Sequence, residues 1–215
     1  DNQAIDEDTS LTIELSASDI DSNDLTFSAT NGDSEISVVG STLTITPPAN
    51  YNGSDDVTVI VTDGDLSDST TFTLTVNPVN DDPTLDDLAD ASVAEDNTYT
   101  LELSGADVDG DALTFQASAD NASASVDGAT LSVTPDADFN GDLTVTVIAS
   151  DGQASGSDSF TLTVTPVNDA PVIGALDNQA IDEDTSLTIE LSASDIDSND
   201  LTFSATNGDS EISVV

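Results

Sequence analysis

Apolar and polar residues alternate along much of this chain. Leu11, Ile13 and Leu15 alternate with Thr12 and Glu14, and the same alternation returns in residues 25–27, 36–38, 43–45, 57–61 and 72–76. A period of two places every second side chain on one face, so each run predicts a β-strand with one buried and one wet face. With a short strand near residues 3–5, this predicts about seven strands before residue 88.

Turn signals separate these runs. They are Asn31-Gly32-Asp33, Asn52-Gly53 and Asp63-Gly64, and such residues favour the tight connections of antiparallel sheets. About seven short strands in fewer than ninety residues are typical of an immunoglobulin-like β-sandwich with Greek-key connections. The sequence therefore predicts an all-β fold.

The pattern is repeated along the chain. Residues 89–176 align without a gap to residues 1–88 and are identical to them at about half of the positions, while residues 177–215 are an identical copy of residues 1–39. We therefore predict tandem sandwich domains in a linear array: repeat 1 (1–88), repeat 2 (89–176) and the first part of a third repeat (177–215). We expect the chain to be a segment of a longer array.

The composition is strongly acidic. The chain has 44 Asp and Glu residues, no Lys, Arg, His or Cys, and a net charge of −44. Nucleic-acid and anionic-membrane binding need basic residues, and nucleophilic catalysis by Cys or by Ser with a His base lacks its parts. Such a charge often indicates disorder, but the apolar fraction of 36% in alternating runs favours folded modules. No apolar run approaches the roughly 20 residues that a membrane helix needs.

Four acidic positions recur in the repeats. They are Glu-Asp at 7–8, 95–96 and 183–184, Asp-x-Asp at 19–21, 107–109 and 195–197, Asp-Gly at 63–64 and 151–152, and Asn-Asp between prolines at 80–81 and 168–169. The candidate metal ligands are Glu7, Asp19, Asp21, Asp63, Asn80, Asp81, Glu95, Asp107, Asp109, Asp151, Asn168, Asp169, Glu183, Asp195 and Asp197. These positions fall at predicted strand ends, where the loops of a sandwich gather.

Oxygen ligands at this density predict a hard cation. Ca²⁺ takes six to eight oxygens from carboxylates, amides, carbonyls and water, whereas Mg²⁺ demands stricter octahedral geometry. Without a cation, each pair of carboxylates at 4 Å costs about 1 kcal/mol in water and about 4 kcal/mol at an effective dielectric of 20. Two plainer readings stay open: a single Asp can serve ordinary turn chemistry, and the general acidity can keep the surface soluble. For the four positions together we predict calcium.

The order Asp-Gly, strand, Asn-Asp-x-Pro and Asp-x-Asp resembles cadherin repeats. It is most similar to the bacterial cadherin-like tandem repeats of giant extracellular adhesins, which end in Val-Asn-Asp-Ala-Pro, as at 167–171, and carry Glu-Asp-Thr, as at 7–9. The resemblance implies calcium between successive domains. It groups Glu7, Asn80, Asp81, Asp107, Asp109 and Asp151 at a first junction, and Glu95, Asn168, Asp169, Asp195 and Asp197 at a second. Animal cadherins add a mid-domain acidic element; residues 48–52 carry no carboxylate there and residues 136–140 do, so we expect fewer ions than in those proteins.

The function expected from this resemblance is structural. The chain would be a calcium-rigidified stalk of a secreted or cell-surface adhesin or filament, with calcium and neighbouring repeats as its partners. The alternative is a self-associating or carbohydrate-binding module that forms a multi-chain extracellular filament. An enzyme is not expected, because paired carboxylates that return in every repeat, without an aromatic cleft, do not fit glycoside hydrolysis.

Overall fold

A computed structural model describes residues 1–21, 24–206 and 213–214. The described residues contain strands but no helix, and so no helix that could cross a membrane. They form two compact units. Unit 1 comprises Asp1–Pro83, Ala106–Leu113 and Asp151–Ser155; unit 2 comprises Thr84–Gly105, Thr114–Ser150 and Gly156–Val215.

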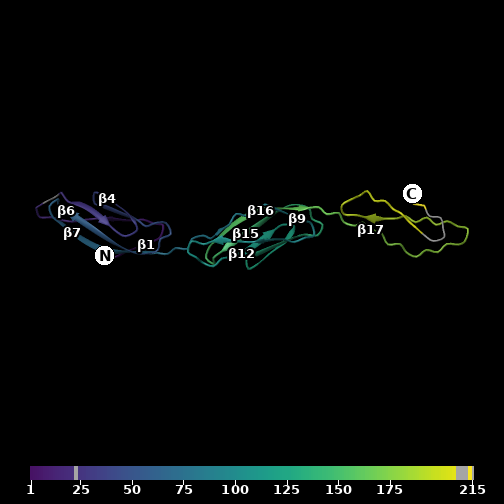
Figure 1. Ribbon diagram of the computed structural model, residues 1–215, viewed down its shortest axis with the longest axis horizontal. Helices are drawn as coiled ribbons and strands as arrows, with labels where there is room; N and C mark the ends of the chain where they lie inside the picture. The colour runs from purple at the N-terminus through teal and green to yellow at the C-terminus, as the bar shows by residue number, and fades with distance from the viewer. Residues whose placement is uncertain (22–23, 207–212, 215) are drawn as a thin grey trace. The chain divides into compact units, whose positions relative to one another are not determined.

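Unit 1 contains a two-layered sandwich of seven strands. The strands are β1 (Gln3–Asp6), β2 (Leu11–Glu14), β3 (Thr26–Thr30), β4 (Glu35–Val39), β5 (Thr42–Thr46), β6 (Gly53–Thr62) and β7 (Ser67–Asn77). One sheet has the order β1-β7-β6-β3 and the other the order β2-β5-β4. Strand β1 runs parallel to β7, with Gln3 opposite Leu74, while β6 and β7 form a long antiparallel hairpin (Figure 1). The predicted strands are confirmed.

The alternating positions supply the core of this sandwich. Leu43, Ile45, Val57 and Leu74 have no exposed surface, and their polar neighbours in sequence face outward. Tyr51, which precedes Asn52-Gly53, packs against the same cluster. Each of these aliphatic side chains contributes about 1.5–3 kcal/mol when fully buried, which is the main stabilisation available to a chain without cysteine.

Unit 2 contains a second sandwich with the same sheet order. Its strands are β8 (Thr84–Leu85), β9 (Ala91–Ala94), β10 (Tyr99–Glu102), β11 (Gly105–Ala106), β12 (Thr114–Ala119), β13 (Ala122–Asp127), β14 (Thr130–Pro135), β15 (Gly141–Ser150) and β16 (Ser155–Thr165), followed by β17 (Val172–Ile173) and β18 (Ala193–Ser194). The sheets β12-β15-β16-β9 and β10-β14-β13 enclose a core around Leu131, Val133, Val145 and Leu162. The all-β, immunoglobulin-like prediction is therefore confirmed for both repeats.

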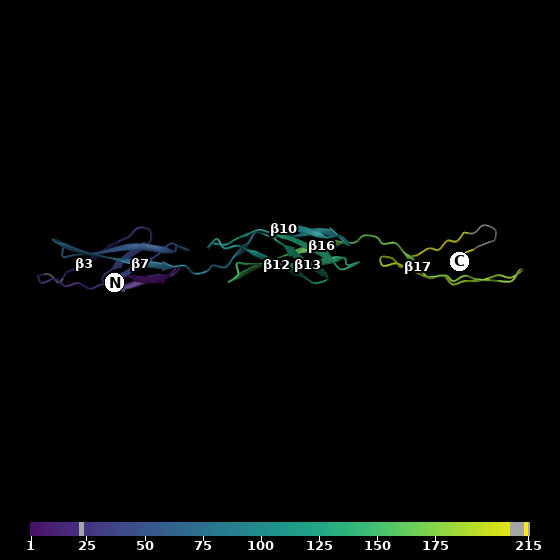
Figure 2. The same ribbon diagram turned by 90° about the horizontal axis from the view of Figure 1, so that it is seen from below.

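The third copy behaves differently. Residues 177–206 have the sequence of residues 1–30, yet their only strand is β18, and Figures 1 and 2 show this part of the chain mostly as loops. In unit 1 the strands β1, β2 and β3 pair with β7, β5 and β6. Residues 177–215 copy only residues 1–39 and thus lack counterparts of β5–β7. Strand formation in this sequence therefore depends on its distant partners rather than on local propensity.

A buried carboxylate fixes one turn of unit 1. Asp55 on β6 is 7% exposed and accepts hydrogen bonds from Asn31 Nδ2 at 2.8 Å, Gly32 N at 3.0 Å and Ser34 Oγ at 3.2 Å. Burial raises the pKa of the Asp55 carboxyl, but hydrogen bonds from the backbone of Gly32, Asp33 and Ser34 and from the Ser34 hydroxyl lower it more, so the pKa lies below its usual value. Asp55 thus ties the β3–β4 turn to β6.

The hydrogen bonds to the Asp55 carboxylate predict that acid lowers the folding stability of repeat 1. Because the folded-state pKa is depressed below 3.8, the carboxylate contributes stability that is complete above pH 3.8 and is lost as pH falls through the folded-state value. Asp55→Asn should cost about 1–3 kcal/mol at pH 7, since it leaves buried donors unpaired, and should weaken the acid dependence. Denaturation followed by Tyr51 fluorescence in a Tyr99→Phe background would measure both. Asp56→Asn is the control. An equal loss of folding stability in that variant would contradict the role given to the Asp55 carboxylate.

Candidate metal centre

A tight turn carries the first candidate ligand into the interior. Glu7 follows β1, and its N–H donates to Asn77 O at 3.0 Å. The next residue, Asp8, has a φ of 59°, a left-handed conformation that Asp tolerates better than most residues. The Glu7 side chain is only 3% exposed, so this turn holds a carboxylate inside the protein.

The Glu7 carboxylate is only half satisfied. Its Oε1 accepts a hydrogen bond from Val79 N at 2.5 Å, and its Oε2 is buried without a hydrogen-bond partner among the described residues. The chain has no Lys, Arg or His that could neutralise it. A buried carboxylate is costly unless it is paired, and no side chain of the printed sequence can supply the positive charge.

The linker in unit 1 is tied to two distant loops. Asn80 donates from Nδ2 to Asp151 Oδ2 at 2.8 Å, and its Oδ1 accepts from Gln153 Nε2 at 2.7 Å. The next residue, Asp81, donates its N–H to Asp109 Oδ2 at 2.8 Å. The structure therefore brings the predicted linker residues together with the predicted Asp-x-Asp and Asp-Gly loops.

The carboxylates of this cluster repel one another. Burial raises the pKa of Asp81, and the negative charges of Asp109, Asp8, Glu7 and Asp107 raise it further. Asp81 Oδ2 and Asp107 Oδ2 are buried and have no hydrogen-bond partner in the described structure. Three buried oxygens without a described hydrogen-bond partner, on Glu7, Asp81 and Asp107, thus belong to carboxylates whose charges meet around Asp81. Carboxylate oxygens are the ligands that hard cations prefer.

Asp151 is held in its charged form. Hydrogen bonds from Ala154 N, Asn80 Nδ2 and Gln153 N lower the pKa of the Asp151 carboxyl. The two backbone bonds each measure 2.6 Å and converge on Oδ1. Asp151 therefore shapes its own loop and fixes Asn80 through Oδ2.

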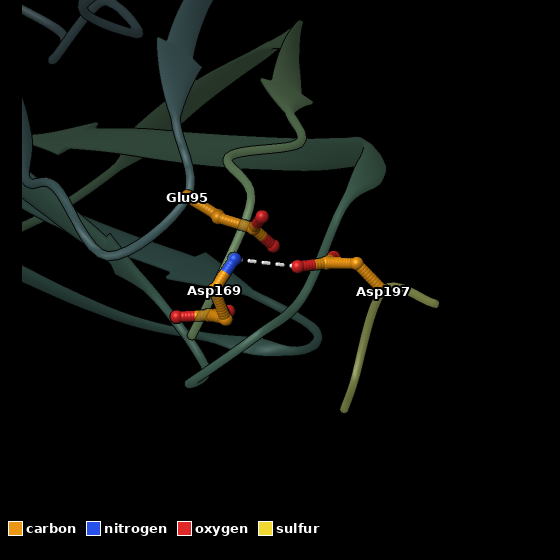
Figure 3. Close-up of side chains that lie close together, drawn as sticks. All are labelled: Glu95, Asp169 and Asp197. Atoms are coloured by element: carbon orange, nitrogen blue, oxygen red, sulfur yellow. Dashed lines mark hydrogen bonds between the residues drawn. The ribbon is translucent and has the colours of Figure 1, made fainter. Parts of the chain in front are cut away.

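A matching cluster lies in unit 2. Glu95 is 2% exposed and accepts a hydrogen bond from Val167 N at 2.5 Å, as Glu7 does from Val79 N. One oxygen each of Glu95, Asp169 and Asp197 lies within 4.8 Å of the others. Figure 3 shows the three side chains and the hydrogen bond of 2.6 Å that Asp169 N donates to Asp197 Oδ2. The hydrogen bonds of the first cluster thus recur around the second Asn-Asp linker, but among the described residues only the second cluster brings three carboxylate oxygens this close together.

Two ligand candidates at the second cluster were missed from the sequence. One oxygen each of Asp96, Asp138 and Asp169 also lies within 4.8 Å of the others, and Asp169 Oδ2 is a buried oxygen without a described hydrogen-bond partner. Burial and then the charges of Asp138, Asp197, Asp96 and Glu95 raise the pKa of Asp169. The available signals were the second acid of Glu-Asp and the carboxylate in residues 136–140.

The remaining predicted ligands lie apart from these clusters. Asp19 Oδ1 accepts from Asp21 N at 2.8 Å, and Asp63 Oδ1 accepts from Asp65 N and Leu66 N at 2.8 and 2.7 Å. Their calcium role stays a prediction.

In the third copy, only some of the predicted ligands lie in formed turns. Asp195 Oδ1 accepts from Asp197 N at 2.9 Å and Ser198 N at 2.7 Å, and Asn168 Nδ2 donates to Asp169 O at 2.7 Å. Glu183 is exposed, unlike its buried counterparts Glu7 and Glu95. The loop around Asp195 is therefore formed, whereas the turn that buries the glutamate is not.

Sequence comparison assigns the chain that carries these clusters to a family. The model of the bacterial Ig domain matches residues 1–77 and again residues 80–165. The chain belongs to the bacterial Ig domain family. This bacterial Ig chain carries the domain twice, and each match ends at or just before an Asn-Asp linker. No curated protein sequence matches the chain.

The chain is also similar to parts of several solved structures. Human protocadherin-24 domains EC1–2 are 11% identical, with 71% of this chain and 86% of that chain covered and a TM-score of 0.45; Drosophila N-cadherin EC1–3 is 12% identical, with 68% and 57% covered and a TM-score of 0.36. An endo-fucoidan hydrolase of glycoside hydrolase family 107 is 24% identical over 77% of this chain, with a TM-score of 0.33. The bacterial Ig chain spans only 28% of that hydrolase. These TM-scores are low, and no functional conclusion follows from them.

Proposed function

We propose that this bacterial Ig chain is a calcium-binding, non-enzymatic stalk segment of an extracellular adhesin or filament of the Val-Asn-Asp-Ala-Pro type. The single observation that carries the proposal is the buried oxygen of Glu7 without a described hydrogen-bond partner, on a carboxylate whose charge acts on Asp81. No cationic side chain is available to it. An extracellular location fits, because bacterial Ig-like domains are typical of extracellular proteins.

The donor set favours Ca²⁺ over other cations. Every candidate ligand is an oxygen, from carboxylates and from the linker amides, and no His or Cys is present to favour a transition metal. The clusters are irregular and include exposed carboxylates, which suits the flexible coordination of calcium better than the strict octahedron of magnesium. Extracellular calcium modules bind at about 10⁻⁴–10⁻³ M, and these exposed sites fit that range.

The proposed role follows from which segments the ligands join. In unit 1 the cluster connects the turn after β1, the linker at 80–81 and the loops at 106–113 and 151–155. An ion shared by these segments would hold the linker in one conformation. Repeated at each linker, this would convert a string of sandwiches into a semi-rigid rod that carries a distant binding domain away from the cell.

Small-angle X-ray scattering tests the proposal. We expect the full chain in 5 mM calcium to show a larger and better defined maximum dimension than the same chain in EGTA, because cation release leaves the acidic linkers free to bend. Magnesium at the same concentration should act more weakly. An unchanged maximum dimension in calcium and in EGTA would rule out calcium as the element that stiffens the linkers.

A further inference from the structure

The β3–β4 turn of repeat 1 contains a chemically labile pair of residues. Asn31-Gly32 lies between Thr30, the last residue of β3, and Glu35, the first residue of β4. In an Asn-Gly pair the glycine nitrogen can attack the side-chain amide carbon of the asparagine, because glycine has no side chain that hinders the approach. Asn31 is half-buried and Gly32 is exposed, so water has access to the pair. The turn is therefore a candidate site of spontaneous deamidation.

Deamidation at this pair needs only water as a co-reactant. Gly32 N gives up its proton and forms a bond to Asn31 Cγ, the bond between Cγ and Nδ2 breaks, and Nδ2 leaves as ammonia. Water then adds to one of the two carbonyl carbons of the cyclic imide and opens the ring. The product at position 31 is aspartate or isoaspartate, and both carry a new negative charge.

In the folded protein, the Asp55 carboxylate holds both groups that would have to react. Gly32 N, the attacking atom, donates to Asp55 Oδ1 at 3.0 Å, and Asn31 Nδ2, the leaving group, donates to Asp55 Oδ2 at 2.8 Å. Asp55 is buried on β6, between β3 and β7 in the sheet, so the acceptor is fixed. Attack requires the Asn31 side chain to rotate until the face of Cγ meets Gly32 N. That rotation breaks the hydrogen bond to Oδ2.

The charge of Asp55 also opposes the reaction. Burial raises the pKa of the Asp55 carboxyl, but its hydrogen bonds lower it more, so the group is ionised at neutral pH. Gly32 N becomes negative when it loses its proton, and a negative charge 3.0 Å from a carboxylate oxygen is repelled. No Lys, Arg or His occurs in the chain to offset this repulsion. Geometry and charge therefore act in the same direction.

The same hydrogen bonds explain why the turn contains an Asn-Gly pair. A Cβ atom at position 32 would lie 3.1 Å from Asp55 Oδ1, so a larger residue there would push the carboxylate away from the backbone. Asn31 supplies the side-chain donor to Oδ2. The residues that bind the carboxylate are thus the two residues that can deamidate.

Repeat 2 has neither the labile pair nor the carboxylate. The positions of Asn31, Gly32, Ser34 and Asp55 are occupied there by Ala119, Asp120, Ala122 and Leu143. Leu143 is 2% exposed and belongs to the core of the second sandwich. Of the two full repeats, the one with Asn-Gly in this turn is also the one with a buried carboxylate beneath it.

We propose that the Asp55 carboxylate protects Asn31-Gly32, a deamidation site of repeat 1, from conversion to aspartate and isoaspartate. Conversion would place a second carboxylate against Asp55, and isoaspartate would also lengthen the backbone between β3 and β4. Because β3 and β4 belong to different sheets, this would loosen the connection between the two layers of the sandwich. The protection does not require the calcium clusters, which contain none of these three residues.

Peptide mass spectrometry of the aged chain tests the proposal, because each event replaces an amide by an acid and changes the mass. We expect Asp55→Ala, which lacks both acceptor oxygens, to deamidate at Asn31 about tenfold faster than the chain with Asp55, which corresponds to about 1.4 kcal/mol in the barrier. The rate at Asn52-Gly53 is the internal reference, since this pair lies in the same repeat and makes no hydrogen bond to Asp55 in the described structure. That rate should not change.

Two further changes keep the signal specific. Asn207→Ser is made in every sample, because residues 191–211 would otherwise give the same peptide as residues 15–35 after cleavage behind Glu. Val59→Ala is the stability control, since Val59 belongs to the core of repeat 1 and makes none of the hydrogen bonds to Asp55. Val59→Ala should not accelerate deamidation selectively in the turn.

A second variant covers the case in which Asp55→Ala does not fold. Asp55→Asn keeps the shape of the side chain but has one acceptor oxygen fewer, so its rate at Asn31 should lie between that of the wild type and that of a synthetic peptide of residues 24–38. In a folded variant, equal acceleration at Asn31 and Asn52 would overturn the proposal, because folding in general would then be what protects. An unchanged rate at Asn31 would also overturn it, and a slower rate would show that the carboxylate promotes the attack.

Discussion

Replacing Glu7 by Gln is expected to destabilise repeat 1 in calcium and to stabilise it in EGTA. Gln keeps the acceptor for Val79 N but removes a buried charge that repels Asp81. Without cation, the loss of one like-charge contact should stabilise repeat 1 by about 1 kcal/mol, the value for two charges 4 Å apart in water. At a calcium concentration 100-fold above Kd the wild type gains about 2.7 kcal/mol that the variant loses.

Thermal unfolding measures this sign reversal directly. Each 1 kcal/mol corresponds to about 4–8 °C in a domain of this size, so shifts in opposite directions should be resolved. Glu183→Gln is the matched control, because its sequence context is the same as that of Glu7 and its side chain is exposed. A Glu7→Gln variant that loses stability equally in calcium and in EGTA would show that Glu7 is a packing residue rather than a ligand.

Exchanging Asn50 and Asp138 should exchange the calcium affinities of the two linkers. The two residues occupy matching turns, with φ of 57° and 58°. Asn50 donates its N–H to Asp8 Oδ1 at 3.0 Å, whereas Asp138 offers a carboxylate near Asp96 and Asp169. One added or removed ligand charge of this kind is expected to change Kd about tenfold, which corresponds to 1.4 kcal/mol.

Isothermal titration calorimetry provides the measurement. Asn50→Asp should strengthen calcium binding or add an ion at the first linker, and Asp138→Asn should weaken binding at the second. Asp136→Asn is the control, since Asp136 lies in the same stretch but outside the carboxylate cluster. Identical titrations for wild type and Asp138→Asn would remove Asp138 from the ligand set.

The strands were predictable because their information is local. The alternation of Leu11, Ile13 and Leu15, or of Val57 and Val59, is visible in any short window, and these residues form strands around the core. The strands of the third copy could not be predicted from local alternation. Its sequence is that of residues 1–39, but its strands need partners that lie beyond position 39 of the repeat.

The candidate site was predictable to a similar extent. The pairing of Asn80-Asp81 with Asp109 and Asp151 followed from the resemblance to cadherin repeats and is present in the structure. The approach of Asp138 to Asp169 was not predictable, because the two are brought together by folding of the whole sandwich rather than by spacing along the chain.

The parallel pairing of β1 with β7 has a consequence for synthesis. Gln3 lies opposite Leu74, so the first strand of the repeat can pair only after the last strand has been synthesised. At translation rates of about 5–20 residues per second, this delay is roughly 4–14 s. Repeat 1 is then complete well before Asp177 has been made. The order of translation thus allows residues 1–39 to pair with β5–β7 before the identical residues 177–215 have been made. Strands β5–β7 then do not pair with the later copy.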